Sequence, residues 1–337
     1  MSIQPEIDFH VRDEWDDHAQ EVHERVANTT VEQFAALMPE ITYPGNNDAA
    51  HLVFTPQNGE YDPRQAIPYF YPFANGNALH LGIRAIFLSE ITGKKVIAFP
   101  NNTLGETYYT LSDQQRKLVS SGNFEPLASK FLQTVLGTIN NPSGIEELIP
   151  AGFSQAGTVA AAVSANTRAH EQAQTLAVSV QEPANVLVRT PAELRKAFMA
   201  AGMEDVYQEM DNSAIPALRE ALQSNRFAGW VNLAKFALGT QVKPNRDINK
   251  GMTQDQLYAD LADGLDQSPN TVVQIVGASD SAIFPFEEHR KIVYKLQKNY
   301  PNSIVDPVSL EGTHAVGDSV INPALAVNRA IRLAKAA

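Results

Sequence analysis

The sequence predicts an α/β protein in which a mostly parallel sheet is covered by helices on both faces. Short apolar runs alternate with amphipathic segments from about residue 50 to the end of the chain. This alternation is typical of strands buried between helices. The 337 residues are 44% hydrophobic and 19% charged, a globular composition that can bury a large core. The chain has no cysteine, which excludes disulfides, thiolate metal sites and a cysteine nucleophile.

The charge balance is acidic, with 38 acidic against 26 basic residues and a net charge of −12. A surface for nucleic acid or an anionic membrane is therefore not expected. The start of the chain lacks the basic and apolar regions of a signal peptide, and the longest uncharged run, 148–167, is too polar to span a bilayer. We expect a soluble, cytoplasmic protein that acts on a small-molecule substrate, with no nucleic-acid partner and no membrane span. The sequence does not indicate an oligomeric state.

Residues 1–49 are predicted to form an acidic N-terminal extension laid over a domain that begins near residue 50. Residues 1–25 hold eight acids and two bases, which is half of the net charge. Among these carboxylates lie His10, His18 and His23, a composition that could suggest a metal site. However, His18 and His23 are five residues apart and so lie on different faces of a helix. A solvated acidic helix is the favoured interpretation.

The order of apolar runs predicts strands and helices in alternation. The expected strands are 51–56, 66–73, 94–100, 144–153, 175–183, 271–280 and 303–312, and the expected helices between them include 79–91, 111–137 and 158–172. One stretch, 189–270, contains no convincing strand and several helical patterns. We predict that it is a helical cap over the carboxyl ends of the strands, where such folds bind ligands. The α/β core would then comprise 50–188 and 271–337. The alternative is a set of packing helices away from any site.

A serine motif lies where an expected strand meets an expected helix. The residues are Gly152, Phe153, Ser154, Gln155 and Ala156, a G-x-S-x-A pattern. A nucleophilic serine on a sharp strand-to-helix turn needs small residues two positions before and two positions after it, because the backbone is strained there. Both positions are small here. Taken alone, the pattern also fits an ordinary loop between a strand and a helix.

Two later residues complete a catalytic set. Asp280 follows the strand 271–280, and His314 lies in the loop after the last strand. The order Ser154, Asp280, His314 is that of α/β-hydrolases. Over roughly residues 50–337 the sequence therefore resembles the serine hydrolases of the α/β-hydrolase fold, of a capped, esterase- or lipase-like kind. The resemblance includes the helical cap after the sixth strand of that fold. Alanine in place of the second motif glycine is the departure from the pattern.

The resemblance implies a role for each residue. Ser154 would attack a carbonyl carbon, His314 would take the serine proton and give it to the leaving group, and Asp280 would orient the imidazole. Glu182, after the strand 175–183, is the alternative acid, because a carboxylate in that place can also reach the histidine.

An oxyanion hole needs two backbone N–H groups directed at the developing charge. We expect one from Gln155, directly after the nucleophile. The other is expected from the loop after the strand 66–73, from Ala74 with Asn75 next in order. The sequence shows no dinucleotide fingerprint, phosphate loop or metal-ligand spacing, so no cofactor and no metal are expected.

The predicted function is hydrolysis of an ester or related acyl bond through an acyl-enzyme. A small, largely apolar substrate is favoured by the aromatic and methionine side chains of the predicted cap, although most of these would form the core of the cap. They are Phe198, Met199, Met203, Tyr207, Trp230, Phe236 and Tyr258. Two alternatives stay open: a non-hydrolytic member of the fold that binds or senses a ligand, and a perhydrolase or C–C hydrolase that uses the same triad.

Overall fold

The computed structural model describes a mixed sheet with helices on both faces. The described residues are 7–40, 42, 49–57, 61–70, 78–100, 110–137, 144–167, 173–201, 214–224, 231, 243–313 and 320–337. Along the sheet the strands are β1 (Leu52–Phe54), β3 (Lys95–Phe99), β2 (Gln65–Phe70), β5 (Ala151–Phe153), β7 (Ala177–Gln181), β8 (Val272–Ala278) and β9 (Val305–Leu310). Only the β1–β3 pair is antiparallel among these neighbours. The predicted mostly parallel sheet is thus confirmed.

The strand expected over 144–153 is divided into β4 (Glu147–Leu148) and β5. Both pieces pair with β2 in one register, which places Pro150 opposite Pro68. Neither proline has an N–H group to donate to a ladder. The pairing is therefore interrupted where the two prolines face each other. Beyond the break, β4 also pairs with the short strand β6 (Gln174–Thr175).

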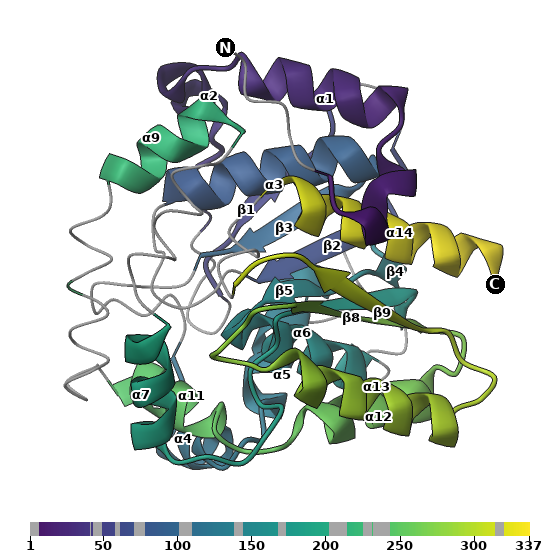
Figure 1. Cartoon of the computed structure of the whole chain (residues 1–337). Helices are drawn as coiled ribbons and strands as arrows, with labels where there is room; N and C mark the ends of the chain where they lie inside the picture. The colour runs from purple at the N-terminus through teal and green to yellow at the C-terminus, as the bar shows by residue number, and fades with distance from the viewer. Residues whose placement is uncertain are drawn as a thin grey trace.

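The helices form two layers (Figure 1). On one face lie α3 (Ala78–Thr92) and the C-terminal α14 (Ile321–Ala336), with α1 (Asp17–Ala27), α2 (Val31–Leu37) and α9 (Pro216–Ser224) packed around α3. On the other face lie α5 (Glu125–Leu136), α6 (Gln155–Asn166), α12 (Leu257–Gln267) and α13 (Phe286–Asn299). Beside this second layer lie α4 (Asp113–Ser120), α11 (Lys243–Gly251) and α7 (Pro191–Ala200).

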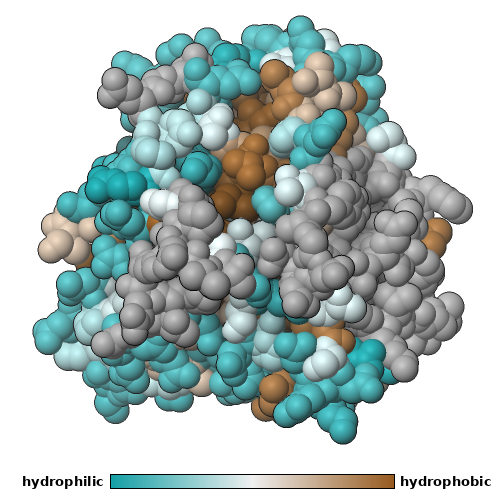
Figure 2. All heavy atoms as spheres, turned by 180° about the vertical axis from the view of Figure 1, so that it is seen from behind, coloured by the Kyte–Doolittle hydropathy of each residue, from teal (hydrophilic) through white to brown (hydrophobic). Residues whose placement is uncertain are grey.

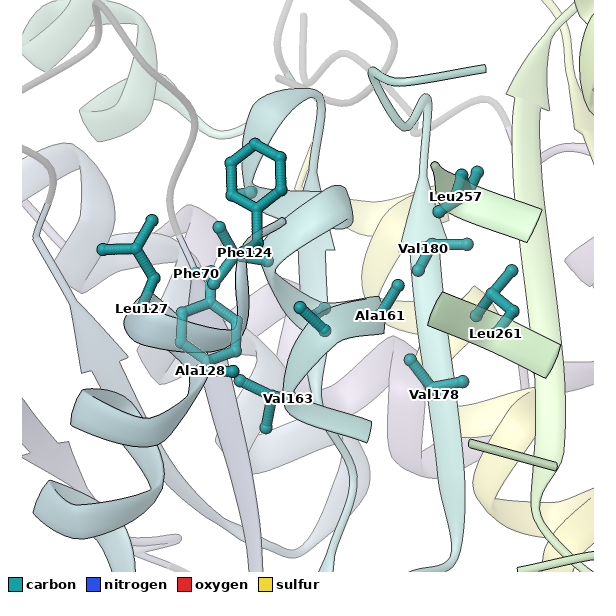
Figure 3. Packing of buried hydrophobic residues seen from close by; sticks show 14 of the residues in the cluster. Phe70, Phe124, Leu127, Ala128, Ala161, Val163, Val178, Val180, Leu257 and Leu261 are labelled. Atoms are coloured by element: carbon teal, nitrogen blue, oxygen red, sulfur yellow. The ribbon is translucent and has the colours of Figure 1, made fainter. Parts of the chain in front are cut away.

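Each face of the sheet has its own apolar core. In β8, for example, Val272 and Val276 belong to the cluster beneath α14, while Val273 and Ile275 belong to the opposite one. Figure 3 shows that second cluster, in which side chains of β7, α6 and α12 gather. Although α12 lies within the range predicted as the cap, it packs on α6, and the Gln267 side chain donates to the Ala165 carbonyl at 2.5 Å.

Two helical predictions differ from the structure. The single helix expected over 111–137 is two helices, α4 and α5, because the chain turns at Gly122 with φ of 95°, a conformation that favours glycine. The helix α11 was not predicted from the sequence, because proline usually ends a helix and Pro244 lies in this segment. Proline is tolerated in the first turn of a helix, and Pro244 is the second residue of α11.

The N-terminal segment packs against the rest of the fold. A 3₁₀ helix, η1 (Phe9–Glu14), contacts α14 and β9, and α1 contacts α3. The expected solvated helix has one buried side, which includes His23. Burial lowers the pKa of His23, and the carboxylate of Glu24 opposes that shift. The His18 Nε2 atom lies 2.9 Å from the Glu90 carbonyl oxygen. These two histidines therefore face different parts of the fold.

The surface is mostly hydrophilic in the view from behind, with apolar residues gathered in the upper half (Figure 2). In the described part of the chain, no helix has the length and apolar character that a membrane crossing requires.

A half-buried acid in α12, Asp260, predicts how stability depends on pH. Burial raises the pKa of Asp260 to about 7, and the nearby Asp263 adds to the shift. Between about pH 4 and pH 7 the folded chain thus keeps a proton that the unfolded chain releases, so stability falls as the pH rises through this range. Asp260→Asn is expected to raise the free energy of unfolding at pH 8 by about 2–4 kcal/mol and to leave it unchanged near pH 4.

Urea unfolding across this pH range measures the effect. Asp255→Asn removes an exposed carboxylate just before α12 and serves as the matched control. It is expected to leave the slope of the free energy of unfolding against pH unchanged. A fall in stability from pH 4 to pH 7 that is equally steep in Asp260→Asn and in the unmodified protein would show that another group is responsible.

Candidate active site

Ser154 occupies a strained turn between β5 and α6. Its backbone has φ of 58° and ψ of −127°, a region that residues other than glycine rarely adopt. Three hydrogen bonds hold it there. The Ser154 N–H donates to the Gln181 carbonyl at 2.8 Å, and the Ser154 carbonyl accepts from Gly157 at 3.0 Å and from Ala184 at 3.2 Å. The end of β5 is therefore tied to the residues that follow β7.

The small residues of the motif allow this turn. A Cβ atom at Gly152 would lie 3.0 Å from the Gly157 nitrogen and closer still to the Ala156 carbonyl. A Cβ atom at Gly157 would lie 3.3 Å from the Pro183 Cα atom. The alanine that replaces the second motif glycine has a buried methyl group in the core cluster. The turn therefore needs the absence of a side chain at Gly152 and Gly157, whereas the methyl group of Ala156 fits in the core.

The backbone N–H of Gln155, an expected oxyanion donor, lies at the start of α6. Gln155 is the first residue of α6, so its N–H has no acceptor inside the helix. A helix N-terminus also favours negative charge. The other expected donors, Ala74 and Asn75, lie outside the described residues.

Asp280 lies beside the segment that leads to His314. It is exposed in the turn after β8, and its N–H donates to the Gly312 carbonyl at 2.9 Å. The Ser279 hydroxyl donates to Asp280 Oδ2 at 3.2 Å and accepts from the Gly312 N–H at 3.3 Å. Gly312, with φ of 115°, is two residues before His314. His314 itself lies outside the described residues.

Glu182, the alternative acid, has a different environment. It is 1% exposed, has φ of 43°, and its N–H donates to the Val276 carbonyl at 2.7 Å. Its carboxylate accepts from the Ala278 N–H, and Oε1 lies 4.0 Å from Nδ1 of the equally buried His289. The Glu182 side chain is thus directed at β8 and α13.

The contact between Glu182 and His289 was not predicted from the sequence. The two residues are more than a hundred positions apart, so no local spacing could bring them together. Gly277 was the available signal, because a Cβ atom there would lie 2.7 Å from His289 Nδ1. A strand glycine often marks the close approach of another group.

Another histidine, His80, lies on the opposite face of the sheet from His289. It is buried in α3, and its Nε2 atom accepts a hydrogen bond from Arg84 Nε at 3.1 Å. Burial, with a smaller contribution from the Arg84 charge, lowers the pKa of His80 well below its usual value. His80 is therefore neutral and serves as an acceptor for a buried arginine.

Three of the apolar residues of the predicted cap are described. Phe198 makes an edge contact with Phe284 at 6.5 Å between ring centroids, and Met199 is 59% exposed. Tyr258 lies beneath the Lys295 ammonium group, 3.5 Å from its ring centroid. Met203, Tyr207, Trp230 and Phe236 lie outside the described residues.

The packing of the turn predicts destabilisation of unequal size for two small substitutions. Gly152→Ala is expected to lower the free energy of unfolding by about 2–3 kcal/mol, because backbone atoms of α6 occupy the place of the new methyl group. Ala156→Gly, the matched control, restores the usual motif and is expected to cost at most about 1 kcal/mol, the helix penalty of glycine. Urea unfolding measures both. If both substitutions lowered the free energy of unfolding by the same amount, residue 152 would have more space beside the Ala156 carbonyl than the structure shows.

No protein-family model matches the sequence, and no curated protein matches it either. Among solved structures, a soluble variant of monoglyceride lipase from Saccharomyces cerevisiae is similar, with 14% identity, 92% of this chain and 97% of that chain covered, and a TM-score of 0.50. A 2-hydroxy-6-oxo-6-phenylhexa-2,4-dienoate hydrolase from Rhodococcus sp. strain RHA1 has 16% identity, coverage of 83% and 93%, and a TM-score of 0.49. A hyperthermophilic esterase from the archaeon Pyrobaculum calidifontis has 14% identity, coverage of 100% and 92%, and a TM-score of 0.47. The strand order and the likeness to the yeast structure agree with the expected architecture, and the protein has the α/β-hydrolase fold.

Proposed function

We propose that the protein is a serine hydrolase that cleaves an ester or related acyl bond of a small, largely apolar substrate. One observation carries the proposal: Ser154 lies on a strained turn at the N-terminus of α6, in the conformation that presents a nucleophile. A strained backbone at a non-glycine residue costs about 1–3 kcal/mol and is found mainly at functional sites. The Asp280 turn and the segment before His314 meet at the same edge of the sheet, which supports the proposed triad.

Acylation would proceed in two steps. The Ser154 Oγ atom attacks the carbonyl carbon while its proton passes to Nε2 of His314. The carbonyl oxygen becomes an oxyanion that accepts hydrogen bonds from the Gln155 N–H and from the proposed second donor, Ala74 or Asn75. When the tetrahedral intermediate collapses, the leaving alkoxide takes the proton from His314. The products are an alcohol and an ester of Ser154.

Deacylation repeats these steps with water as the nucleophile. His314 accepts a proton from the water as it attacks the acyl carbon, and returns that proton to Ser154 when the ester breaks. The carboxylic acid leaves and the free enzyme is restored. A monoglyceride lipase is among the solved structures similar to this chain, at a TM-score of 0.50, which supports the proposal of acyl hydrolysis.

Asp280 is the proposed orienting acid because of the contacts that each candidate already makes. The Glu182 carboxylate is buried, accepts from the Ala278 N–H and lies against His289. Asp280 is exposed, and its backbone is hydrogen-bonded to Gly312, two residues before His314. The proposal therefore gives the triad role to Asp280 and a structural role to Glu182.

Replacing the nucleophile tests the proposal. Ser154→Ala is expected to lower turnover of p-nitrophenyl esters by more than about a thousandfold and to abolish labelling by a fluorophosphonate probe. Ser164→Ala, a buried serine of the same helix, is the control and should keep both activities. A Ser154→Ala variant with more than about a hundredth of the original rate would show that the nucleophile lies elsewhere.

The unmodified protein distinguishes the reaction classes. A panel of p-nitrophenyl esters of rising acyl length, together with probe labelling, would show turnover and labelling if the protein is an ester hydrolase. Labelling without turnover would favour a perhydrolase or C–C hydrolase that uses the triad. Absence of labelling would favour a ligand-binding protein.

Amide substitutions distinguish the two acids. Asp280→Asn is expected to lower kcat by about three to four orders of magnitude, because an amide can present N–H to the imidazole and favour the wrong tautomer. Glu182→Gln is expected to lower kcat less than about tenfold, since the amide oxygen can still accept from the Ala278 N–H. Steady-state kinetics on one ester measures both. The reverse order of effects would assign the acid to the residue after β7.

A further inference from the structure

One residue of the N-terminal segment touches both ends of the connection that carries His314. The Asp8 Oδ2 atom accepts a hydrogen bond from the Glu311 N–H at 2.9 Å, directly after β9. The Asp8 N–H donates to Asn322 Oδ1 at 3.1 Å, at the start of α14. Asp8 is 8% exposed, so these contacts are largely shielded from water. A residue that precedes the core by more than forty positions thus holds the two ends of 311–322 together.

Asp8 is itself held by η1. Its Oδ1 atom accepts from the His10 N–H at 2.9 Å, which caps the 3₁₀ helix, and Val11 of that helix is fully buried in the core cluster. At the other end of η1, Glu14 is 4% exposed and forms an ion pair with Arg332 of α14 at 2.5 Å. Burial raises the pKa of Glu14, and Arg332 and Arg329 oppose the shift.

The connection is also held from its other side. Gly312 exchanges hydrogen bonds with Ser279 and Asp280, the turn after β8. Glu311 and Gly312 therefore lie between the proposed acid on one side and Asp8 on the other. His314 follows two residues later.

We propose that Asp8 is a positioning residue for His314. The N-terminal segment then contributes to catalysis through the position of that histidine. The proposal rests on the proposed function, because it presumes His314 as the base. A carboxylate suits the position, because it accepts from two backbone N–H groups at once, His10 on Oδ1 and Glu311 on Oδ2. A displacement of about 1 Å at a reacting group can lower the rate a hundredfold. Loss of the hydrogen bonds to the Asp8 carboxylate should therefore lower kcat.

The test separates positioning from folding by counting active sites. Asp8→Ala, Asp8→Asn and the control Asp13→Ala, an exposed carboxylate of the same segment, are titrated with a fluorophosphonate probe. Ester turnover is then expressed per labelled site. Asp8→Ala is expected to lower kcat per site by about 10- to 100-fold with KM changed less than about threefold. The kcat per site of Asp8→Asn should lie between those of Asp8→Ala and the unmodified protein, because the amide oxygen replaces only one of the two acceptors. The kcat per site of Asp13→Ala should equal that of the unmodified protein.

Hydrogen exchange of peptides over 308–325 provides a second measurement. The Glu311 amide is expected to exchange faster in both Asp8 variants and at the original rate in Asp13→Ala. A lower labelled fraction with unchanged kcat per site would overturn the proposal, because Asp8 would then act only on folding. Unchanged kcat per site with faster exchange at Glu311 would overturn it as well.

The same experiment keeps the two proposals apart. If the unmodified protein takes no label and turns over no ester, the proposed function is wrong, and the positioning role for His314 is wrong with it. If the unmodified protein is labelled and active, Ser154→Ala is not, and the Asp8 variants retain full kcat per site, only the role of Asp8 is wrong. Should Asp8→Ala fail to fold, Asp8→Asn alone decides, since it keeps one acceptor for the two donors.

Discussion

The crossing of β5 into α6 at Gly152 and Ser154 is the constraint on which the site depends. The strand must end under the helix that follows it, and the carbonyl of Ala156 fills the space where any side chain of residue 152 would lie. This arrangement forces Ser154 to a positive φ, which is unfavourable by about 1–3 kcal/mol. Three backbone hydrogen bonds to both carbonyl and N–H of Ser154 hold the strained conformation. The glycine at position 152 and the strained backbone of Ser154 are therefore one feature.

From this turn a series of contacts crosses the carboxyl edge of the sheet. The residue after β5 donates to the last residue of β7, since the Ser154 N–H bonds the Gln181 carbonyl. The residue after β7, Glu182, accepts from the Ala278 N–H at the end of β8. The turn after β8 then bonds Gly312 after β9, and the Glu311 N–H beside it bonds Asp8. Each connection is held by the next one, so the relative places of Ser154, Asp280 and Gly312 are set by neighbouring connections rather than by any one loop.

The sequence predicted the features that depend on local pattern. The buried strands and the helix after Ser154 follow from short motifs and apolar runs, and the order of nucleophile, acid and histidine stays a prediction from the same kind of pattern. It did not predict the break at Pro68 and Pro150, because the effect appears only when the register places the two prolines opposite each other. The Glu182–His289 contact and the reach of Asp8 to Glu311 were missed for the same reason. Such contacts join residues that are about a hundred to three hundred positions apart, and no spacing rule covers that separation.

Register is itself a difficulty for buried parallel strands, and a row of polar side chains resolves it here. Both faces of β8 are apolar in the core, so its apolar pattern alone would tolerate a shift of one residue. On the face beneath α14, however, Ser179 of β7 donates to Gln274 of β8 at 2.8 Å, and Gln274 donates to Asp306 of β9 at 2.9 Å. Arg329 of α14 ends the row with two hydrogen bonds to the Asp306 carboxylate.

A shift of one residue in register would move one of these polar groups to the opposite core. It would leave a buried carboxylate without its partner, which is strongly destabilising. The row therefore protects the register of the three strands whose ends carry Glu182, Asp280 and the segment before His314. The register determines how far along the sheet each of these strands ends. The buried polar side chains therefore determine where the turns after β7, β8 and β9 lie relative to one another.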